Sequence, residues 1–183
     1  MISILKKNSL KFIVLIIAFL MITGFTNVQK SVSLEQNMEN VQILAGAVDV
    51  EGEGVSITLT DNETQINNSN NIIHDIDLIK IVNLLTSEGA EVISINDERL
   101  ISTSKIKANK MRIQINDNEY SSPFVIKAIG DPETLSDALK TEESYVNLLK
   151  EYIGIKIEKE DKLFIPKYTG DIYFNYAKPV EKK

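Results

Sequence analysis

The chain has 183 residues, a length that suits one domain with a short appendage, and 43% of them are hydrophobic, which is enough for a packed core. It contains no cysteine, which excludes disulfides, thiolate nucleophiles and thiolate metal sites. The first 30 residues carry four lysines and no acid, so 16 basic and 26 acidic residues, a net charge of −10, remain for residues 31–183. Such a domain repels nucleic acids and anionic lipids overall, and no nucleic-acid partner is expected.

An uncharged apolar segment runs from Phe12 to Phe25. Its core is shorter than the ~20 residues that span a bilayer, but apolar neighbours extend it on both sides. Three lysines precede the segment and only Lys30 follows closely, so the positive-inside rule places the N-terminus in the cytoplasm and the rest of the chain outside. We therefore expect a single-pass membrane anchor. The alternative is a cleaved signal peptide, whose cleavage site near Ser31 and Ser33 would lie several residues beyond the apolar run.

The sequence predicts three parts. Residues 1–30 form a cytoplasmic stub and the transmembrane anchor, residues 31–46 form a short amphipathic helical connector, and residues 47–183 form the extracytoplasmic domain. In the connector, apolar residues are spaced by four, three and four positions, at Leu34, Met38, Val41 and Ala45. This is an a/d pattern, but it covers barely two heptads. The connector is interpreted as a single helix standing off the membrane, with weak homo-oligomerisation through residues 31–46 as the alternative.

The domain begins with a strand over residues 55–60, where apolar and polar residues alternate, and Gly52 and Gly54 are interpreted as turn residues before it. A helix is predicted over residues 72–88, with an apolar stripe and a closing glycine at Gly89. The stripe consists of four residues at helical spacing, Ile72, Ile76, Ile79 and Val82. Leu78 and Leu85 are expected to widen it.

Four strands are predicted next, over residues 91–96, 99–102, 111–115 and 123–129. Asp131 followed by proline then indicates a helix start, and a short helix is expected over residues 145–152. Two last strands flank a turn predicted at Asp161 and Lys162. This order predicts an α+β fold, with a ferredoxin-like topology: a mostly antiparallel sheet with two or three helices on one face, preceded by the N-terminal membrane helix.

Residues for catalysis are scarce. His74 is the one histidine. The sequence contains no nucleophile motif for a catalytic triad and no phosphate-binding or calcium-binding motif. A His/Cys zinc site is excluded by count. We predict a non-enzymatic protein with no catalytic, cofactor-binding or metal-binding residues.

Candidate ligand or partner contacts are Asn83, Asn96, Arg99 and Asp131. The Arg99 guanidinium could bind a carboxylate or phosphate through two parallel hydrogen bonds. The structural alternative is a hydrogen bond to turn carbonyls. For Asp131 the structural alternative is the helix cap itself. A basic stretch of Lys105, Lys107, Lys110 and Arg112 is interpreted as a solvated loop and strand edge.

Three stretches resemble a known family: IVNLLTSEGAEVISINDERLISTS, SSPFVIKAIGDPETLSDAL and FIPKYTGDIYFNYAKPV. The combination of GAExISIN, PFxIKAIGDPxTL and YAKPV, between about Ala45 and Val180, is similar to the YlxW/YlxX-like uncharacterised family of Gram-positive bacteria. The resemblance implies one membrane helix, often a coiled coil, and an extracytoplasmic domain, encoded near cell-division and cell-wall genes. This chain departs from that layout in its short connector, and the family supplies no catalytic residue.

The sequence therefore predicts a non-catalytic, membrane-anchored envelope protein. Its expected role is that of a protein-interaction or scaffold module whose partners are other envelope or division proteins. Two alternatives stay open: an extracytoplasmic sensor for a small ligand, and a secreted domain released by signal-peptide cleavage.

Overall fold

The computed structural model describes residue 29 and residues 33–62 and 71–180, in two compact units, Met1–Gln42 and Ile43–Lys183. The predicted anchor from Phe12 to Phe25 lies outside the described residues. Within the described part, no helix is both long and apolar enough to cross a membrane.

The first unit contributes a helical segment, residues 33–44, which continues two residues into the second unit. Its apolar side chains are largely exposed: 56% for Leu34, 62% for Met38 and 59% for Val41. Leu34, Met38 and Val41 therefore share one helix, whereas Ala45 lies in the turn that follows it.

The second unit is a mixed α+β domain, as predicted at that level. Its main sheet has five strands in the order β3-β2-β7-β1-β8, and each pair of neighbours is antiparallel. The strand bounds are Val50–Thr60 for β1, Val92–Ile95 for β2, Glu98–Arg99 for β3, Phe124–Ile129 for β7 and Gly154–Ile165 for β8. A second, three-stranded antiparallel sheet contains β4 (Ile106–Asn109), β5 (Arg112–Ile115) and β6 (Asn118–Tyr120).

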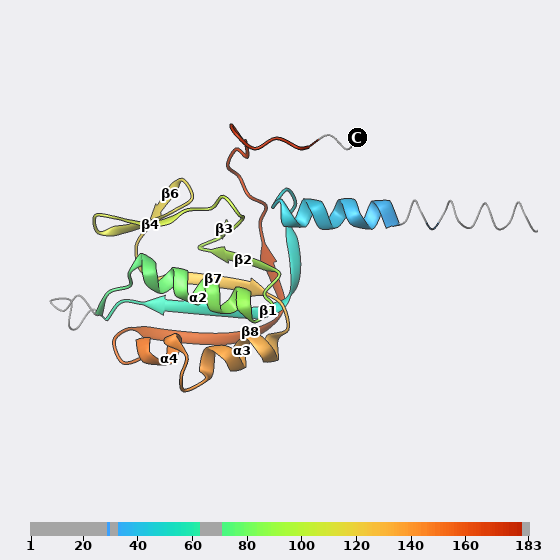
Figure 1. The fold of residues 1–183 in the computed structure, drawn as a ribbon. Coiled ribbons are helices and arrows are strands. Elements are labelled where there is room, and N and C mark those ends of the chain that lie inside the picture. Colours follow the sequence, from blue (N-terminus) through green and yellow to red (C-terminus); the bar gives the residue numbers. More distant parts are fainter. Residues whose placement is uncertain (1–28, 30–32, 63–70, 181–183) are drawn as a thin grey trace, which may run out of the picture. The chain divides into compact units, whose positions relative to one another are not determined.

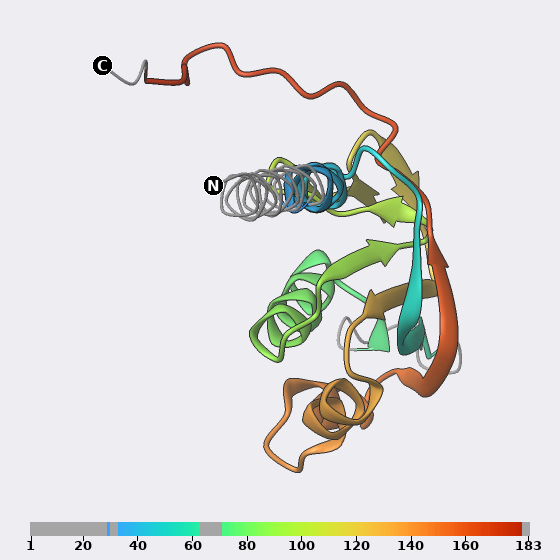
Figure 2. The ribbon, with the colours of Figure 1, turned by 90° about the vertical axis from the view of Figure 1, so that its right-hand side faces the viewer.

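Three helices lie on the same side of the main sheet (Figures 1 and 2). They are α2 (Asp75–Ser87), α3 (Pro132–Lys140) and α4 (Tyr145–Leu149). The start of α3 is as predicted, because the Asp131 carboxylate accepts a hydrogen bond from the Thr134 amide and proline occupies the first turn.

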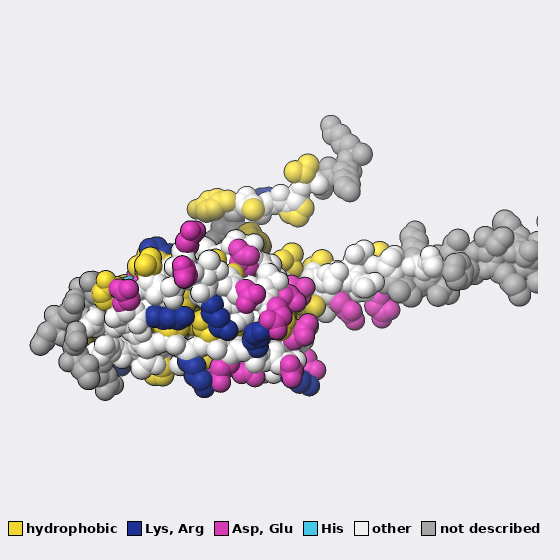
Figure 3. All heavy atoms as spheres, turned by 90° about the horizontal axis from the view of Figure 1, so that it is seen from below, with side chains coloured by type: hydrophobic (Ala, Val, Ile, Leu, Met, Phe, Trp, Pro, Cys, Tyr) yellow, Lys and Arg dark blue, Asp and Glu magenta, His cyan; other side chains and the backbone are white. Residues whose placement is uncertain are grey.

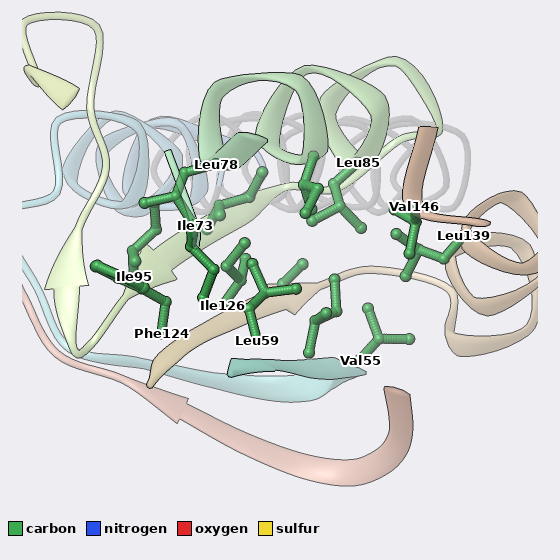
Figure 4. Close-up of a cluster of buried hydrophobic side chains, with 14 of the residues drawn as sticks. Val55, Leu59, Ile73, Leu78, Leu85, Ile95, Phe124, Ile126, Leu139 and Val146 are labelled. Carbon is green, nitrogen blue, oxygen red and sulfur yellow. The ribbon is translucent and has the colours of Figure 1, made fainter. Parts of the chain in front are cut away.

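The core lies between this side of the sheet and the helices (Figure 4). Val55, Ile57 and Leu59 of β1 alternate toward it and are fully buried. Burial of each such side chain contributes about 1.5–3 kcal/mol relative to exposure. From α2 the buried stripe is Leu78, Ile81 and Leu85.

The stripe predicted from the sequence was partly right. Leu78 and Leu85, which were expected to widen it, are buried, and Val82 packs against the core, but Ile72 and Ile79 are only half-buried. Ile76 is 47% exposed. Isoleucine and leucine recur all around this helix, so periodicity alone placed the stripe on an adjacent face.

Gly52 and Gly54 lie inside β1 rather than in a turn before it. The pairing of β1 with β8 shifts register between these two residues, which marks a β-bulge. A Cβ atom on Gly54 would lie 2.0 Å from the carbonyl oxygen of Ala128, and one on Gly52 would lie 2.9 Å from Cγ2 of Ile129. The glycines therefore permit close packing of β1 on β7.

The terminal hairpin was also wrong. Asp161 and Lys162 are exposed residues within the continuous twelve-residue strand β8. Beyond the bulge this strand ends in Leu163 and Ile165, which pack with Val92 and Ile129 in a second, smaller apolar cluster. Because strand residues alternate, Ile129 faces away from the helix-covered side that Ala128 faces. The curled β1–β8 pair thus buries part of the other face.

Candidate functional site

Asn96 occupies the turn between β2 and β3. It and Asp97 have positive φ angles of 49° and 64°, as a two-residue hairpin turn requires. The Asn96 side chain accepts a 2.7 Å hydrogen bond from the Val125 amide and donates a 3.4 Å bond to the Pro123 carbonyl. Its polar atoms are therefore used to fix the start of β7.

Arg99 is buried, with 3% of its surface exposed. Its Nη2 atom donates a 2.7 Å hydrogen bond to the carbonyl of Ile43, in the last turn of the helical segment 33–44. Burial lowers the pKa of the guanidinium below its usual value. The structural alternative predicted a bond to turn carbonyls, but the observed acceptor is instead this carbonyl at the end of the helix, which also accepts a 3.0 Å hydrogen bond from the Gly46 amide.

Glu98 links the two sheets, a role that the sequence did not indicate. Its carboxylate accepts hydrogen bonds from Asn118 at 2.6 Å, from the Tyr120 hydroxyl at 2.8 Å and from Asn116 at 3.3 Å. Burial and this carboxylate raise the pKa of Tyr120 to about 12. Asn116 also donates to the Arg99 carbonyl, at 3.1 Å. The cluster holds β3 and β6 together.

A buried carboxylate, Asp77, joins α2 to α4. It accepts a 2.6 Å hydrogen bond from the Tyr145 hydroxyl and a 2.7 Å bond from the His74 amide. Burial and Asp77 raise the pKa of Tyr145 to about 12. The Lys80 ammonium lies 3.9 Å from the centre of the Tyr145 ring. These contacts stabilise the packing of helices, and no sequence signal connected Asp77 with a tyrosine 68 residues away.

The other two predicted contact residues lie elsewhere. Asp131 is the exposed cap of α3, and its hydrogen bond with Thr134 lowers the pKa of the carboxyl. Asn83 is exposed on α2 and lines a shallow hollow with Lys105 and Lys107, which none of the other three candidates line. The structure therefore brings Asn96 and Arg99 into one hairpin but does not gather the four residues into one site.

Two partly enclosed hollows lie among the described residues. One of ≈ 410 Å³ has a largely apolar wall that includes Ile73, Ile113, Tyr120 and Phe124. The other, of ≈ 290 Å³, is polar and is lined by Thr103, Lys105, Asn116, Asp117, Tyr168, Asp171 and Tyr173. Among the described residues, no group of three His, Cys, Asp or Glu side chains is arranged to hold a metal ion.

Most of this chain is similar to known bacterial proteins. A family model described as "Bacterial protein of unknown function (DUF881)" matches residues 37–178. The chain belongs to this family. The UPF0749 protein YlxW of Bacillus subtilis is 32% identical to this DUF881 chain over 129 residues, which are 68% of the chain and 56% of YlxW. The predicted resemblance is thus confirmed.

Mycobacterial proteins are also similar to this chain in sequence and in structure. The UPF0749 protein Rv1823 of Mycobacterium tuberculosis is 29% identical over 152 residues, 75% of this chain and 50% of that protein. A crystal structure of an uncharacterized conserved protein from Mycobacterium tuberculosis superposes with a TM-score of 0.65 at 26% identity, covering 79% of this chain and 99% of that one. This DUF881 chain spans about half the length of the curated relatives it matches.

Proposed function

We propose that this DUF881 protein is a non-catalytic interaction module of the cell envelope, tethered outside the membrane by the segment from Phe12 to Phe25. The observation that carries the proposal is the exposed stripe of Leu34, Met38 and Val41 on the helical segment 33–44. An apolar stripe at heptad spacing gains stability when it is buried against another helix.

The partner we propose for this stripe is the same helix of a second copy, in parallel. Barely two heptads give weak pairing in solution, but two copies tethered in one membrane meet at a high effective concentration. A parallel pair would leave the globular domains on the same side, free to contact other envelope or division proteins. The arrangement is that of a small scaffold.

Site-specific disulfide crosslinking tests this proposal, because the chain has no native cysteine. In a parallel pair Met38 faces its counterpart at the seam, whereas Gln36, also exposed, lies on the outer side. We expect Met38→Cys to form a disulfide dimer in oxidised membranes and Gln36→Cys to remain monomeric. Equal crosslinking at both positions, or none at Met38→Cys, would sink the paired-helix proposal.

The topology proposed for the main sheet is ferredoxin-like. Support comes from the chain order β1-α2-β2 and β7-α3-α4-β8, combined with the antiparallel neighbour order β2-β7-β1-β8. The extra strand β3 and the β4–β6 sheet are then insertions between the two halves.

The sensor alternative is favoured by the ≈ 410 Å³ hollow, whose wall combines buried Phe124 with the Tyr120 ring. Apolar walls with a few polar groups are typical of small-molecule sites. A rise in melting temperature on adding small envelope metabolites, absent for matched non-ligands, would favour this alternative over the scaffold.

A further inference from the structure

The β4–β5 hairpin concentrates positive charge on an acidic chain. Residues 105–112, here called the basic hairpin, contain Lys105, Lys107, Lys110 and Arg112 and no acid. The rest of residues 31–183 holds 12 basic and 26 acidic residues. The basic hairpin is therefore a local positive surface on a domain whose net charge is negative.

The pairing register places the charged side chains on one face of the hairpin. Ala108 pairs with Ile113, and Lys107 pairs with Gln114. Because strand residues alternate, buried Ile113 faces inward, while Lys107, paired with the next residue along β5, is exposed on the opposite face. Arg112 follows this alternation and pairs with Asn109, and its side chain is exposed.

Two carboxylates are hydrogen-bonded to the basic hairpin itself, and its four positive charges still exceed these two negative ones. Asp75 accepts a 2.7 Å hydrogen bond from the Ala108 amide, and Glu119 accepts one from the Asn109 side chain. The four ion pairs between described residues use Lys127, Lys156, Lys159 and Lys162. On the face shown in Figure 3, basic and acidic side chains are interspersed. None of these ion pairs joins a lysine or arginine side chain of the basic hairpin to a carboxylate.

The turn of the hairpin adds an apolar tip. Lys110 has a φ of 57°, and Met111 beside it is 96% exposed. The methionine thus stands between two cationic side chains, Lys110 and Arg112. Apolar side chains flanked by lysine and arginine bind at the boundary between headgroups and acyl chains of anionic membranes.

We propose that the basic hairpin docks on the anionic phospholipid surface of a bilayer, with Met111 at the headgroup boundary. This inference rests on the proposed tether only in that the tether keeps the hairpin close to a membrane. Acidic parts of the domain further away oppose docking little, because the Debye length is about 8 Å at physiological salt. The exposed methionine favours a bilayer over a soluble polyanion, which offers no apolar layer.

A single fluorescent label can test the docking in the full-length protein, because Met111→Cys creates a unique thiol. The labelled protein is reconstituted in vesicles of phosphatidylcholine, with or without phosphatidylglycerol. We expect a blue shift and quenching by lipid-borne quenchers only when phosphatidylglycerol is present, and loss of both in high salt. Asp161→Cys, exposed on β8 at the other edge of the main sheet, is the control and should not respond.

Charge variants complete the test. Each Lys or Arg near an anionic surface strengthens binding about fivefold, so Lys107→Gln, Lys110→Gln and Arg112→Gln together should abolish the Met111→Cys response. The triple variant should still float with vesicles, and flotation separately reports whether the tether holds. No shift at position 111, an equal shift at 161, or a shift kept by the triple variant would each overturn the proposal. A response to soluble polyphosphate but not to vesicles would also overturn it.

Discussion

Arginine is used in two opposite ways in this chain. Arg99 is buried and donates to the Ile43 carbonyl, whereas Arg112 is exposed on the basic hairpin. They are the two arginines of the protein, so each is the natural control for the other. The comparison separates a guanidinium that stabilises the fold from one that is available to a partner.

Arg99→Ala should lower the free energy of unfolding by about 1–3 kcal/mol, because it removes the hydrogen bond to the Ile43 carbonyl and leaves a space where the buried side chain packed. Arg112→Ala should change the same quantity by less than about 0.5 kcal/mol. Urea unfolding of the two variants and the parent protein measures both. If Arg99→Ala unfolds at the same urea concentration as the parent, the guanidinium does not stabilise the domain.

At the scale of the elements, the bulge in the β1–β8 pairing, where Asp161 and Lys162 of β8 lie opposite Glu53 of β1, shapes the sheet. It lets the ends of β1 and β8 curl so that Leu163 and Ile165 cover Ile129 on the face without helices. Without this bend, an apolar part of the sheet would be exposed to water. The curvature therefore depends on the absence of side chains at Gly52 and Gly54.

Gly54→Ala should destabilise the domain by at least about 2 kcal/mol, because the new methyl group would meet the Ala128 carbonyl in a rigid part of the sheet. Gly154→Ala is the matched control: its Cβ would lie 3.5 Å from Cβ of Thr60, an ordinary contact. Thermal unfolding should show a large drop in melting temperature for the first variant and a change within about 0.5 kcal/mol for the second. Similar melting temperatures for both would show that β1 can shift away from β7.

Local signals predicted some elements well and failed where the cause was distant. The cap at Asp131 follows from adjacent residues, and the structure confirms it. The continuous strand β8 did not follow, because its polar middle, including Asp161 and Lys162, resembles a turn until its pairing with β1 is known. The need for glycine at position 54 did not follow either, because the group that leaves no room for a side chain there is the backbone of β7.

The hydrogen-bond partners of two predicted contact residues also lie too far along the chain to be predicted from local sequence. Asn96 and Arg99 were singled out as polar residues around a turn, and both proved to be hydrogen-bonded to backbone groups far along the chain, at Val125 and Ile43. Sequence spacing cannot show such partners. The basic hairpin was visible as a charge cluster, but its outward register and the exposure of Met111 required the fold.

At the scale of the whole molecule, the proposals share one premise, that the domain lies outside the membrane. Its basis is the asymmetry of lysines around the segment from Phe12 to Phe25, with Lys6, Lys7 and Lys11 before it and Lys30 after it. Cytoplasmic lysines resist translocation, so they orient the first apolar segment with the N-terminus inside.

We expect a C-terminal fusion to an export-dependent reporter to be active, and a fusion to a reporter that functions only in the cytoplasm to be inactive. Replacing Lys6, Lys7 and Lys11 with glutamine should weaken this bias, while the same change at Lys30 should not. A retained anchor further requires that the mature protein keep its first residues and sediment with membranes. An N-terminus near Leu34 would instead show signal-peptide cleavage, and activity of the cytoplasmic reporter alone would refute the outside location. Such a result would remove the membrane tether from the scaffold proposal and leave the lipid-docking hairpin to be judged on its vesicle response alone.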